Sequence, residues 1–451
     1  MWNEDTRAYI EALYAEIPNT YPELDGFYGF LGEPMPGERG RLFTEAILPG
    51  LQRSGRQMHY IVNQWQVPLA SFQEYVVQSD YPDLWLGFHG YNSESLTDAK
   101  PYPGVVWWAE QTGLPTVSDL YPGNMLYFPL NSPRFAYEII AEMKKVEGFA
   151  GFIYWERHIS GSILGPMFRE ALARYASSDE PYSDEPWLER LEDEFGTRAA
   201  AEHMLEAYDA IARVIPETDA LVYSGGDVLR RELRLPYEFL LGEYPWSYTA
   251  SPARGSRLVP IDHYARFVAR SPSRFQERNG SELDRAPFYQ EAVWGSEGGS
   301  IFNTTPVEHM SHVVELGVAG SRAAESAVAA STQNKPKAER VRALARASEL
   351  LSQYYQMKIA AAVAARVYAE SGRSMDRVEA ERLADIALKQ YQETATYMHE
   401  HLDPYYIEIS GSPLTEAGLR FPELIEAEQR ERRDIAEIFG WPESDTEGVG
   451  R

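Results

Sequence analysis

The sequence predicts an α/β protein, a partial TIM-like (β/α) barrel followed by a mainly α-helical C-terminal domain. Two observations carry this prediction. Short apolar runs alternate with helix-length stretches up to residue 158, and long amphipathic runs fill the chain from residue 304 onward. The 451 residues are enough for two or three domains. We expect a five-stranded partial barrel at 1–176, a helical and irregular linking region at 177–303, and a helical domain at 304–451.

Five segments are expected to form the strands of a parallel sheet. Each is apolar and then stops at a cluster of polar or aromatic residues. Short buried strands separated by helix-length stretches are typical of repeated βα units. The five segments are GFYGFLGEP (26–34), MHYIVNQW (58–65), LWLGFHGYN (84–92), PTVSDLYPGN (115–124) and GFAGFIYWERH (148–158).

Helices are predicted where apolar side chains recur with helical spacing. The first, at 4–17, precedes the first strand and is expected to stop at Pro18. Ser132-Pro133 and the capping-box sequence at 305–308 are typical helix starts. The acidic, Pro- and Ser-rich stretch 177–187 predicts a linker, and 219–300 shows no pattern that we assign. Further helices are expected at 40–54, 68–79, 104–113, 132–147, 186–195, 197–214 (closed by Pro216), 306–331, 337–372, 375–402 and 422–439.

The composition excludes several classes of partner. The net charge of −26 would repel nucleic acid and anionic membrane surfaces, so neither is expected as a partner. The chain has no Cys, which excludes disulfides, and no apolar run of about 18 residues that would span a membrane. Its first residues lack the basic and apolar regions of a signal peptide. The chain as given therefore predicts a cytoplasmic protein, and a truncated N-terminus would leave an extracytoplasmic location open.

Polar side chains gather where the expected strands end. In parallel sheets of this kind, ligands bind at the carboxyl ends of the strands. Three of the five residues there are carboxylates, and aromatic residues flank several of them. That composition is typical of a carbohydrate-cleaving site, in which one carboxyl donates a proton and another activates water. The five residues are Glu33, Asn63, His89, Asp119 and Glu156.

The three carboxylates are the candidate catalytic residues, and each has a structural alternative. Glu33 lies between Gly32 and Pro34 after an apolar strand, where apolar neighbours would favour the protonated form that a general acid needs. Its alternative is an exposed loop carboxylate. Asp119 precedes a Tyr-Pro-Gly turn and could instead bond its own backbone. Glu156 follows a strand that is apolar enough to be buried, and could instead form a structural salt bridge.

Candidate substrate-binding residues surround these carboxylates. Asn63 and Trp65 would hydrogen-bond and stack on a sugar ring, while His89 has a purely structural role as its alternative. A uronic acid substrate would need a basic partner such as Arg157, His158 or Arg134. The spacing of His, Asp and Glu suits no metal site, and no P-loop or nucleophile elbow is present, so we expect no metal and no cofactor. The full set is Asn63, Trp65, His89, Tyr91, Tyr121, Asn124, Trp155 and Arg157.

The run YPELDGFYGFLGEP resembles the segment that enters the fourth strand of (β/α)8 glycoside hydrolases, where a Glu at the strand end is the acid. Together with Asp119 and Glu156, it is similar to the α-glucuronidases that act on xylan. The helical run YYQMKIAAAVAARVYAESG (354–372) adds to this similarity. The resemblance implies that Glu33 is the general acid, that Asp119 and Glu156 activate water, and that the anomeric configuration is inverted.

The same resemblance makes the five segments the fourth to eighth strands of a barrel, with the first three strands absent. An open sheet of this kind exposes apolar edges. We therefore expect a second chain, a homo-oligomer or the stretch 219–300 to cover the edge. Two hypotheses follow. The first is a glycoside hydrolase, or the C-terminal portion of one, that acts on a plant or algal carbohydrate. The second is a non-catalytic carbohydrate-binding or scaffold protein on a degenerate half barrel.

Overall fold

The computed structural model divides the chain into two compact units. The first, called here the sheet unit, consists of Met1–Leu96, Lys100–Tyr121 and Ile139–Trp155, and the second, the helical unit, of Thr97–Ala99, Pro122–Glu138 and Glu156–Arg451. The boundaries expected at 176 and 303 stay predictions. The structure describes residues 3–31, 40–64, 67, 69–88, 99, 101, 103–120, 132–154, 165–222, 233–237, 240, 261, 265, 305–402, 421–439 and 441.

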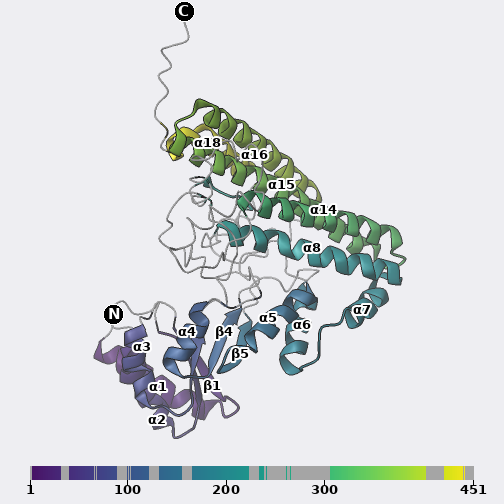
Figure 1. The fold of residues 1–451 in the computed structure, drawn as a ribbon. Helices are drawn as coiled ribbons and strands as arrows, with labels where there is room; N and C mark the ends of the chain where they lie inside the picture. Colours follow the sequence, from purple (N-terminus) through teal and green to yellow (C-terminus); the bar gives the residue numbers. More distant parts are fainter. Residues whose placement is uncertain are drawn as a thin grey trace, which may run out of the picture. The chain divides into compact units, whose positions relative to one another are not determined.

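Five parallel strands form a single sheet in the order β1-β2-β3-β4-β5, as the sequence predicts (Figure 1). They are β1 (Gly26–Phe30), β2 (His59–Asn63), β3 (Leu84–Phe88), β4 (Thr116–Leu120) and β5 (Phe149–Tyr154). The helical segments before and between them are α1 (Glu4–Thr20), η1 (Phe43–Ile47), α2 (Leu48–Ser54), α3 (Leu69–Tyr75), η2 (Val77–Ser79), α4 (Pro103–Thr112) and α5 (Pro133–Met143).

The strands follow one another across the sheet in the order of the sequence. Each strand lies beside the next one in the sequence, whereas the order reverses in a doubly wound sheet. Asn63 on β2 is in register with Gly87 on β3, and Gly87 with Val117 on β4. In an eight-stranded barrel of shear eight, the strands are tilted. An inward side chain therefore shares a layer with the residue two positions beyond its register partner on the next strand but one. Asn63 bonds Asp119, two residues beyond Val117, which is the offset that such a barrel would require.

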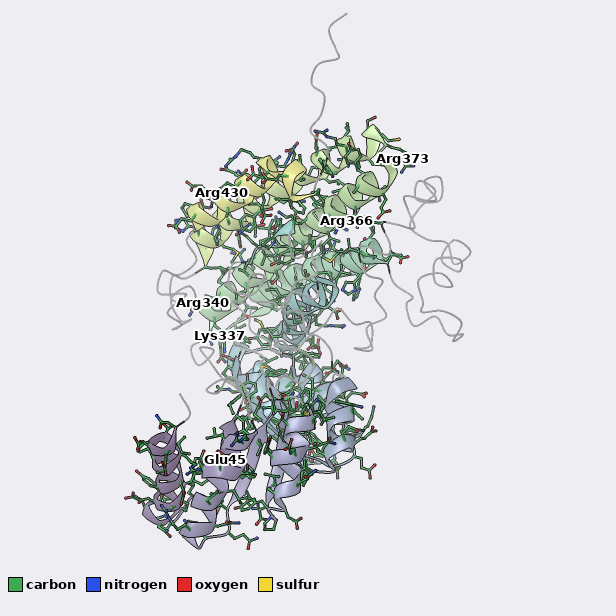
Figure 2. The ribbon with its side chains drawn as sticks, turned by 90° about the vertical axis from the view of Figure 1, so that its left-hand side faces the viewer. Glu45, Lys337, Arg340, Arg366, Arg373 and Arg430 are labelled. Atoms are coloured by element: carbon green, nitrogen blue, oxygen red, sulfur yellow. The ribbon has the colours of Figure 1, made fainter. Side chains whose placement is uncertain are left out.

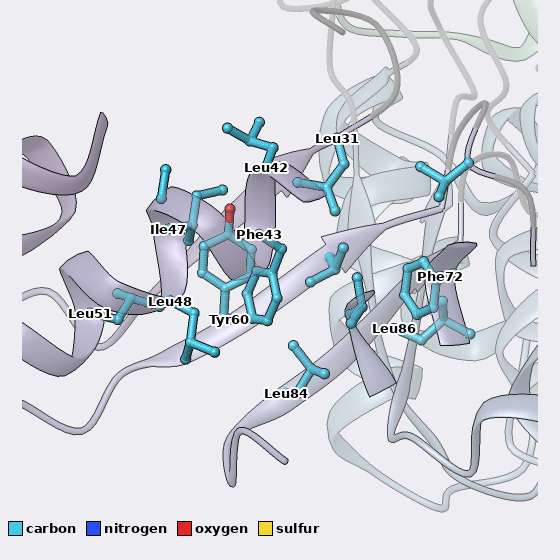
Figure 3. Close-up of a cluster of buried hydrophobic side chains, with 14 of the residues drawn as sticks. Leu31, Leu42, Phe43, Ile47, Leu48, Leu51, Tyr60, Phe72, Leu84 and Leu86 are labelled. Atoms are coloured by element: carbon cyan, nitrogen blue, oxygen red, sulfur yellow. The ribbon is translucent and has the colours of Figure 1, made fainter. Parts of the chain in front are cut away.

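One face of the sheet packs against helices through a cluster of buried apolar side chains (Figure 3). Tyr60 from β2 lies at its centre, against the ring of Phe43, and its hydroxyl is 3.2 Å from the hydroxyl of Tyr14 on α1. Burial raises the pKa of Tyr60, so this side chain stays neutral. The residues of β1 are half-buried, and β2 is the one strand paired with it in the described part of the chain. What covers its other edge stays a prediction.

Two helices continue past the prolines that were expected to end them. Pro18 lies inside α1, in its last turn, where a proline removes little more than one backbone hydrogen bond. Arg56 donates to carbonyl oxygens of the segment that follows α1, including those of Tyr21 at 3.2 Å and Leu24 at 3.0 Å. Pro216 likewise lies inside α8 (Arg198–Val222). Helix α6 (Gly165–Ser177) was not predicted at all.

Helices make up most of the described part of the second unit. Besides α6, they include α7 (Glu185–Phe195), α8, α14 (Pro306–Ala330), α15 (Lys335–Ser371), α16 (Ser374–His401), α18 (Phe421–Arg433) and the short α19 (Ile435–Ile438). The predicted capping box is present at Thr305 and Glu308. Small residues let the helices approach closely, because a Cβ on Gly317 would lie 2.6 Å from the Ser352 hydroxyl. Lys337, which Figure 2 labels, lies in the first turn of α15. It contacts Glu194 of α7. No helix among these described segments is long and apolar enough to span a membrane.

A cluster of two positive and two negative side chains is buried in the helical unit. Glu428 on α18 is 2% exposed and contacts both Lys358 of α15 and Arg234, the latter at 3.3 Å. Glu431 accepts from Arg234 at 2.7 Å and from Lys358 at 2.8 Å. Burial raises the pKa of the Glu431 carboxyl, although the Lys358 ammonium opposes the shift. The cluster fixes residues 233–237 against α15 and α18.

Glu428→Gln is expected to lower the free energy of unfolding by about 3 kcal/mol, because it leaves two buried positive charges with Glu431 alone to balance them. Urea unfolding followed by circular dichroism measures the change. Glu426→Gln on the exposed face of the same helix is the matched control and should change stability by less than about 0.5 kcal/mol. Equal stability of the two variants would contradict the role assigned to the cluster.

Candidate functional site

Three polar side chains from three strands meet on the sheet face opposite the apolar cluster. On β1, Phe27 lies 6.2 Å from the Tyr60 ring in the apolar cluster, so Tyr28, the next residue, projects to the other face. On β2, Tyr60 and Val62 belong to the cluster, and Asn63 follows on the opposite face. Asp119 comes from β4, whose five residues are all buried.

The three side chains form a connected hydrogen-bond network. The Tyr28 hydroxyl is 2.7 Å from both Oδ1 and Oδ2 of Asp119. The Asn63 amide nitrogen lies 2.5 Å from the Tyr28 hydroxyl and 3.0 Å from Asp119 Oδ2. Asn63 therefore donates to both partners, and Tyr28 in turn donates to Asp119. We refer to Tyr28, Asn63 and Asp119 as the polar triad.

Burial makes these hydrogen bonds necessary. Asn63 and Asp119 are both 0% exposed. An uncompensated carboxylate in such a place would cost several kcal/mol or more, and hydrogen bonds from fixed donors offset that cost. An ionised carboxylate only accepts, so the nitrogen of the Asn63 amide, rather than its oxygen, must face Asp119. The carboxylate is thereby held in a defined orientation by donors on two other strands.

Gly87 on β3 provides the space for this arrangement. A Cβ built on Gly87 would lie 3.1 Å from the Cα of Asn63, from Cγ2 of Ile61 and from Cε2 of Tyr28. These distances are shorter than most Cβ contacts in proteins. The absent side chain is what allows the Tyr28 ring to cross β3 and reach β4.

Of the predicted site residues, the structure describes Asn63 and Asp119 and brings them into direct contact. Tyr28 is not among the predicted site residues, although strand alternation already puts it on the face opposite Phe27. The separation of the three candidate catalytic carboxyls stays a prediction. The following predicted residues lie outside the described part of the chain: Glu33, Trp65, His89, Tyr91, Tyr121, Asn124, Trp155, Glu156 and Arg157.

The triad suits proton transfer or charge stabilisation. A carboxylate held in one orientation can accept a proton from water or stabilise a developing positive charge. Within the described ranges, no group of three or more His, Asp or Glu side chains is arranged to hold a metal ion.

Arg134, one of the basic residues considered for a uronic acid, is engaged in the helical unit. Its guanidinium lies 3.1 Å from Asp184 and 3.8 Å from Asp209, and it stacks 4.5 Å from the centre of the Tyr182 ring. Burial raises the pKa of Asp209 to about 6, although a hydrogen bond from Ser132 and the charge of Arg134 lower it. These contacts give Arg134 a structural role in fixing α5 to its neighbours.

The fold defined by the sheet and helices is similar to that of a glycoside hydrolase of known structure. The match is to a GH138 enzyme targeting pectin rhamnogalacturonan II, with a TM-score of 0.76 and 16% sequence identity. It covers 97% of this chain and 65% of that one, so the chain spans about two thirds of the length of the enzyme it matches. At this identity the likeness concerns the fold alone. No family's sequence model matches the chain, and no curated protein matches it.

The comparison confirms the coarse prediction of a glycoside hydrolase-like fold. The finer resemblance to the α-glucuronidases and the closure of the strands into a barrel or half barrel stay predictions.

Gly87→Ala is expected to destabilise the protein by about 1–3 kcal/mol, because the added methyl group forces Asn63 and Tyr28 apart in a packed interior. Thermal and urea unfolding measure the loss. Unchanged stability would mean that the Tyr28 ring moves aside freely and that the triad is not tightly packed.

Asp209→Asn is expected to be more stable relative to the wild type at pH 7 than at pH 4. The pKa of Asp209 is about 6 in the folded protein, and its ordinary value is 3.8. The contribution of Asp209 to stability is therefore fully present below about pH 4 and is lost as the pH rises through about 6. The shift sets an upper limit of about 3 kcal/mol on the effect. Urea unfolding of both proteins between pH 4 and 7 tests it, and parallel stability curves would refute it.

Proposed function

We propose that the chain is a glycoside hydrolase, or the C-terminal portion of one, that acts on a plant or algal polysaccharide or oligosaccharide, including those with uronic acids. The observation that carries the proposal is the buried Asp119 carboxylate, held by Tyr28 and Asn63 near the carboxyl end of a parallel strand. The similarity of the fold to an enzyme targeting pectin rhamnogalacturonan II supports it.

The mechanism that we propose assigns one role to each candidate carboxyl. Glu33, three residues beyond the end of β1 in the sequence, donates a proton to the leaving oxygen. Asp119, together with Glu156, accepts a proton from the attacking water on the opposite side of the sugar. Inverting enzymes separate acid and base carboxyls by roughly 6.5–9.5 Å, and we propose that range for Glu33 and Asp119.

The environment of Asp119 suits the role of a base. A base must present its carboxylate to the water in one orientation throughout the reaction, and the triad holds Asp119 through donors fixed on separate strands. Sites supported by strands are held more tightly than sites on loops.

The complete burial of Asp119 favours a second candidate function, a non-catalytic carbohydrate-binding protein built on the same sheet. In that case the triad would serve only to fill and stabilise the interior. The two functions differ in one measurable respect, because only the first releases reducing ends from a polysaccharide.

Asp119→Asn is expected to lower kcat by about 10³-fold, since an amide cannot accept the proton of water. Reducing-sugar release from rhamnogalacturonan II, glucuronoxylan and algal polysaccharides provides the assay, and Glu33→Gln tests the acid in parallel. NMR of the first product formed from an active substrate distinguishes inversion from retention at the anomeric carbon.

Asp83→Asn is the matched control, because Asp83 precedes β3 and bonds Gln57 at the opposite end of the strands. It should keep kcat within about twofold of the wild type. A wild-type protein that binds these polysaccharides without cleaving them would replace the first function with the second.

A further inference from the structure

We propose that Tyr28 is a positioning residue that orients the carboxylate of Asp119 for proton transfer. The inference rests on the proposed function and adds to it a residue that no strand-end pattern identifies. Tyr28 acts through Asp119, which is the group that would touch the reacting water.

The geometry of the Tyr28 hydroxyl supports this role. The Tyr28 hydroxyl is 2.7 Å from each oxygen of the Asp119 carboxylate, so it lies midway between them. A contact to both oxygens restrains rotation of the whole carboxylate. A contact to one oxygen alone would leave the carboxylate free to turn about that bond. Hydrogen bonds to a charged acceptor are also stronger than those between neutral groups.

Asn63 determines where the single proton of Tyr28 points. Its amide nitrogen donates to the Tyr28 oxygen at 2.5 Å, so that oxygen accepts from Asn63 and its own hydrogen is directed at Asp119. The second amide hydrogen of Asn63 is directed at Asp119 Oδ2, 3.0 Å away. The chain of donors therefore runs in one direction, from Asn63 through Tyr28 to Asp119.

Tyr28 also connects the two strands whose relative position the proposed mechanism depends on. It stands on β1, the strand that Glu33 follows in the sequence, and bonds Asp119 on β4. The hydroxyl thus fixes the proposed base relative to the strand that precedes the proposed acid. A displacement of the base by about 1 Å costs on the order of 10²-fold in rate.

Tyr28→Phe tests the proposal while keeping the ring that packs over Gly87. We expect kcat to fall by about 10- to 100-fold and KM to change by less than about threefold, because binding of the sugar does not depend on the hydroxyl. In an Asp119→Asn background, the same substitution should have no further effect on kcat, because Tyr28 acts through Asp119.

Tyr60→Phe is the matched control. Tyr60 lies on the neighbouring strand, is 0% exposed and bonds a neutral partner, Tyr14, on the other face of the sheet. It should lose stability to a similar extent as Tyr28→Phe and keep wild-type kcat. Thermal unfolding of both variants separates a loss of folding from a loss of orientation.

The outcomes separate the two proposals. Wild-type kcat in Tyr28→Phe, beside an inactive Asp119→Asn, overturns the positioning role and leaves the proposed function intact. A KM that rises with unchanged kcat, or a further loss of kcat in the Asp119→Asn background, also overturns it, because Tyr28 would then act on the substrate. An inactive wild type overturns the proposed function and the positioning role together. An Asp119→Asn variant with wild-type kcat overturns the role of Asp119 as the base, and with it the positioning role, while glycoside hydrolysis stands.

Discussion

The hydrogen bond between Tyr28 on β1 and Asp119 on β4 requires the sheet to curve. Neighbouring strands lie about 4.8 Å apart, so in a flat sheet β1 and β4 would be separated by about 14 Å, farther than the two side chains can bridge from parallel positions. The observed distance of 2.7 Å therefore means that the strands curl around this face. Asn63 bonds Asp119 two residues beyond Val117, and this offset has the same origin, because strands tilt when a sheet curls.

Curvature and a buried carboxylate depend on each other in this sheet. Bending brings donors from β1 and β2 to an acceptor on β4, and those donors offset the cost of removing the charge from water. The bend in turn needs room on the strand in between, which Gly87 provides. The face toward the helices has no such requirement, and there Tyr60 and its apolar neighbours fill the space as in an ordinary core (Figure 3).

The sequence predicts those parts of the fold that depend on local patterns. Apolar runs bounded by turn residues locate all five strands, and the capping box at Thr305 locates the start of α14. Asn63 and Asp119 stand out because polar residues are rare in buried strands. Pro18 does not end the helix where it was expected to, because Arg56, far along the chain, donates to the Pro18 carbonyl and to carbonyls just after the helix. The role of Tyr28 depends on a partner 91 residues away and on a curvature that no local pattern encodes.

Two buried polar clusters in the described part of the chain show what separates a structural arrangement from a candidate site. In the helical unit, Arg234 and Lys358 face Glu428 and Glu431, so four charges cancel and fix a chain segment against two helices. In the sheet unit, a hydroxyl and an amide hold a carboxylate at a defined place on a strand. Cancelled charges give stability that apolar residues could replace. Tyr28 and Asn63 are neutral donors, so their hydrogen bonds orient the Asp119 carboxylate without adding a charge, and a fixed orientation is what a proton-accepting group requires.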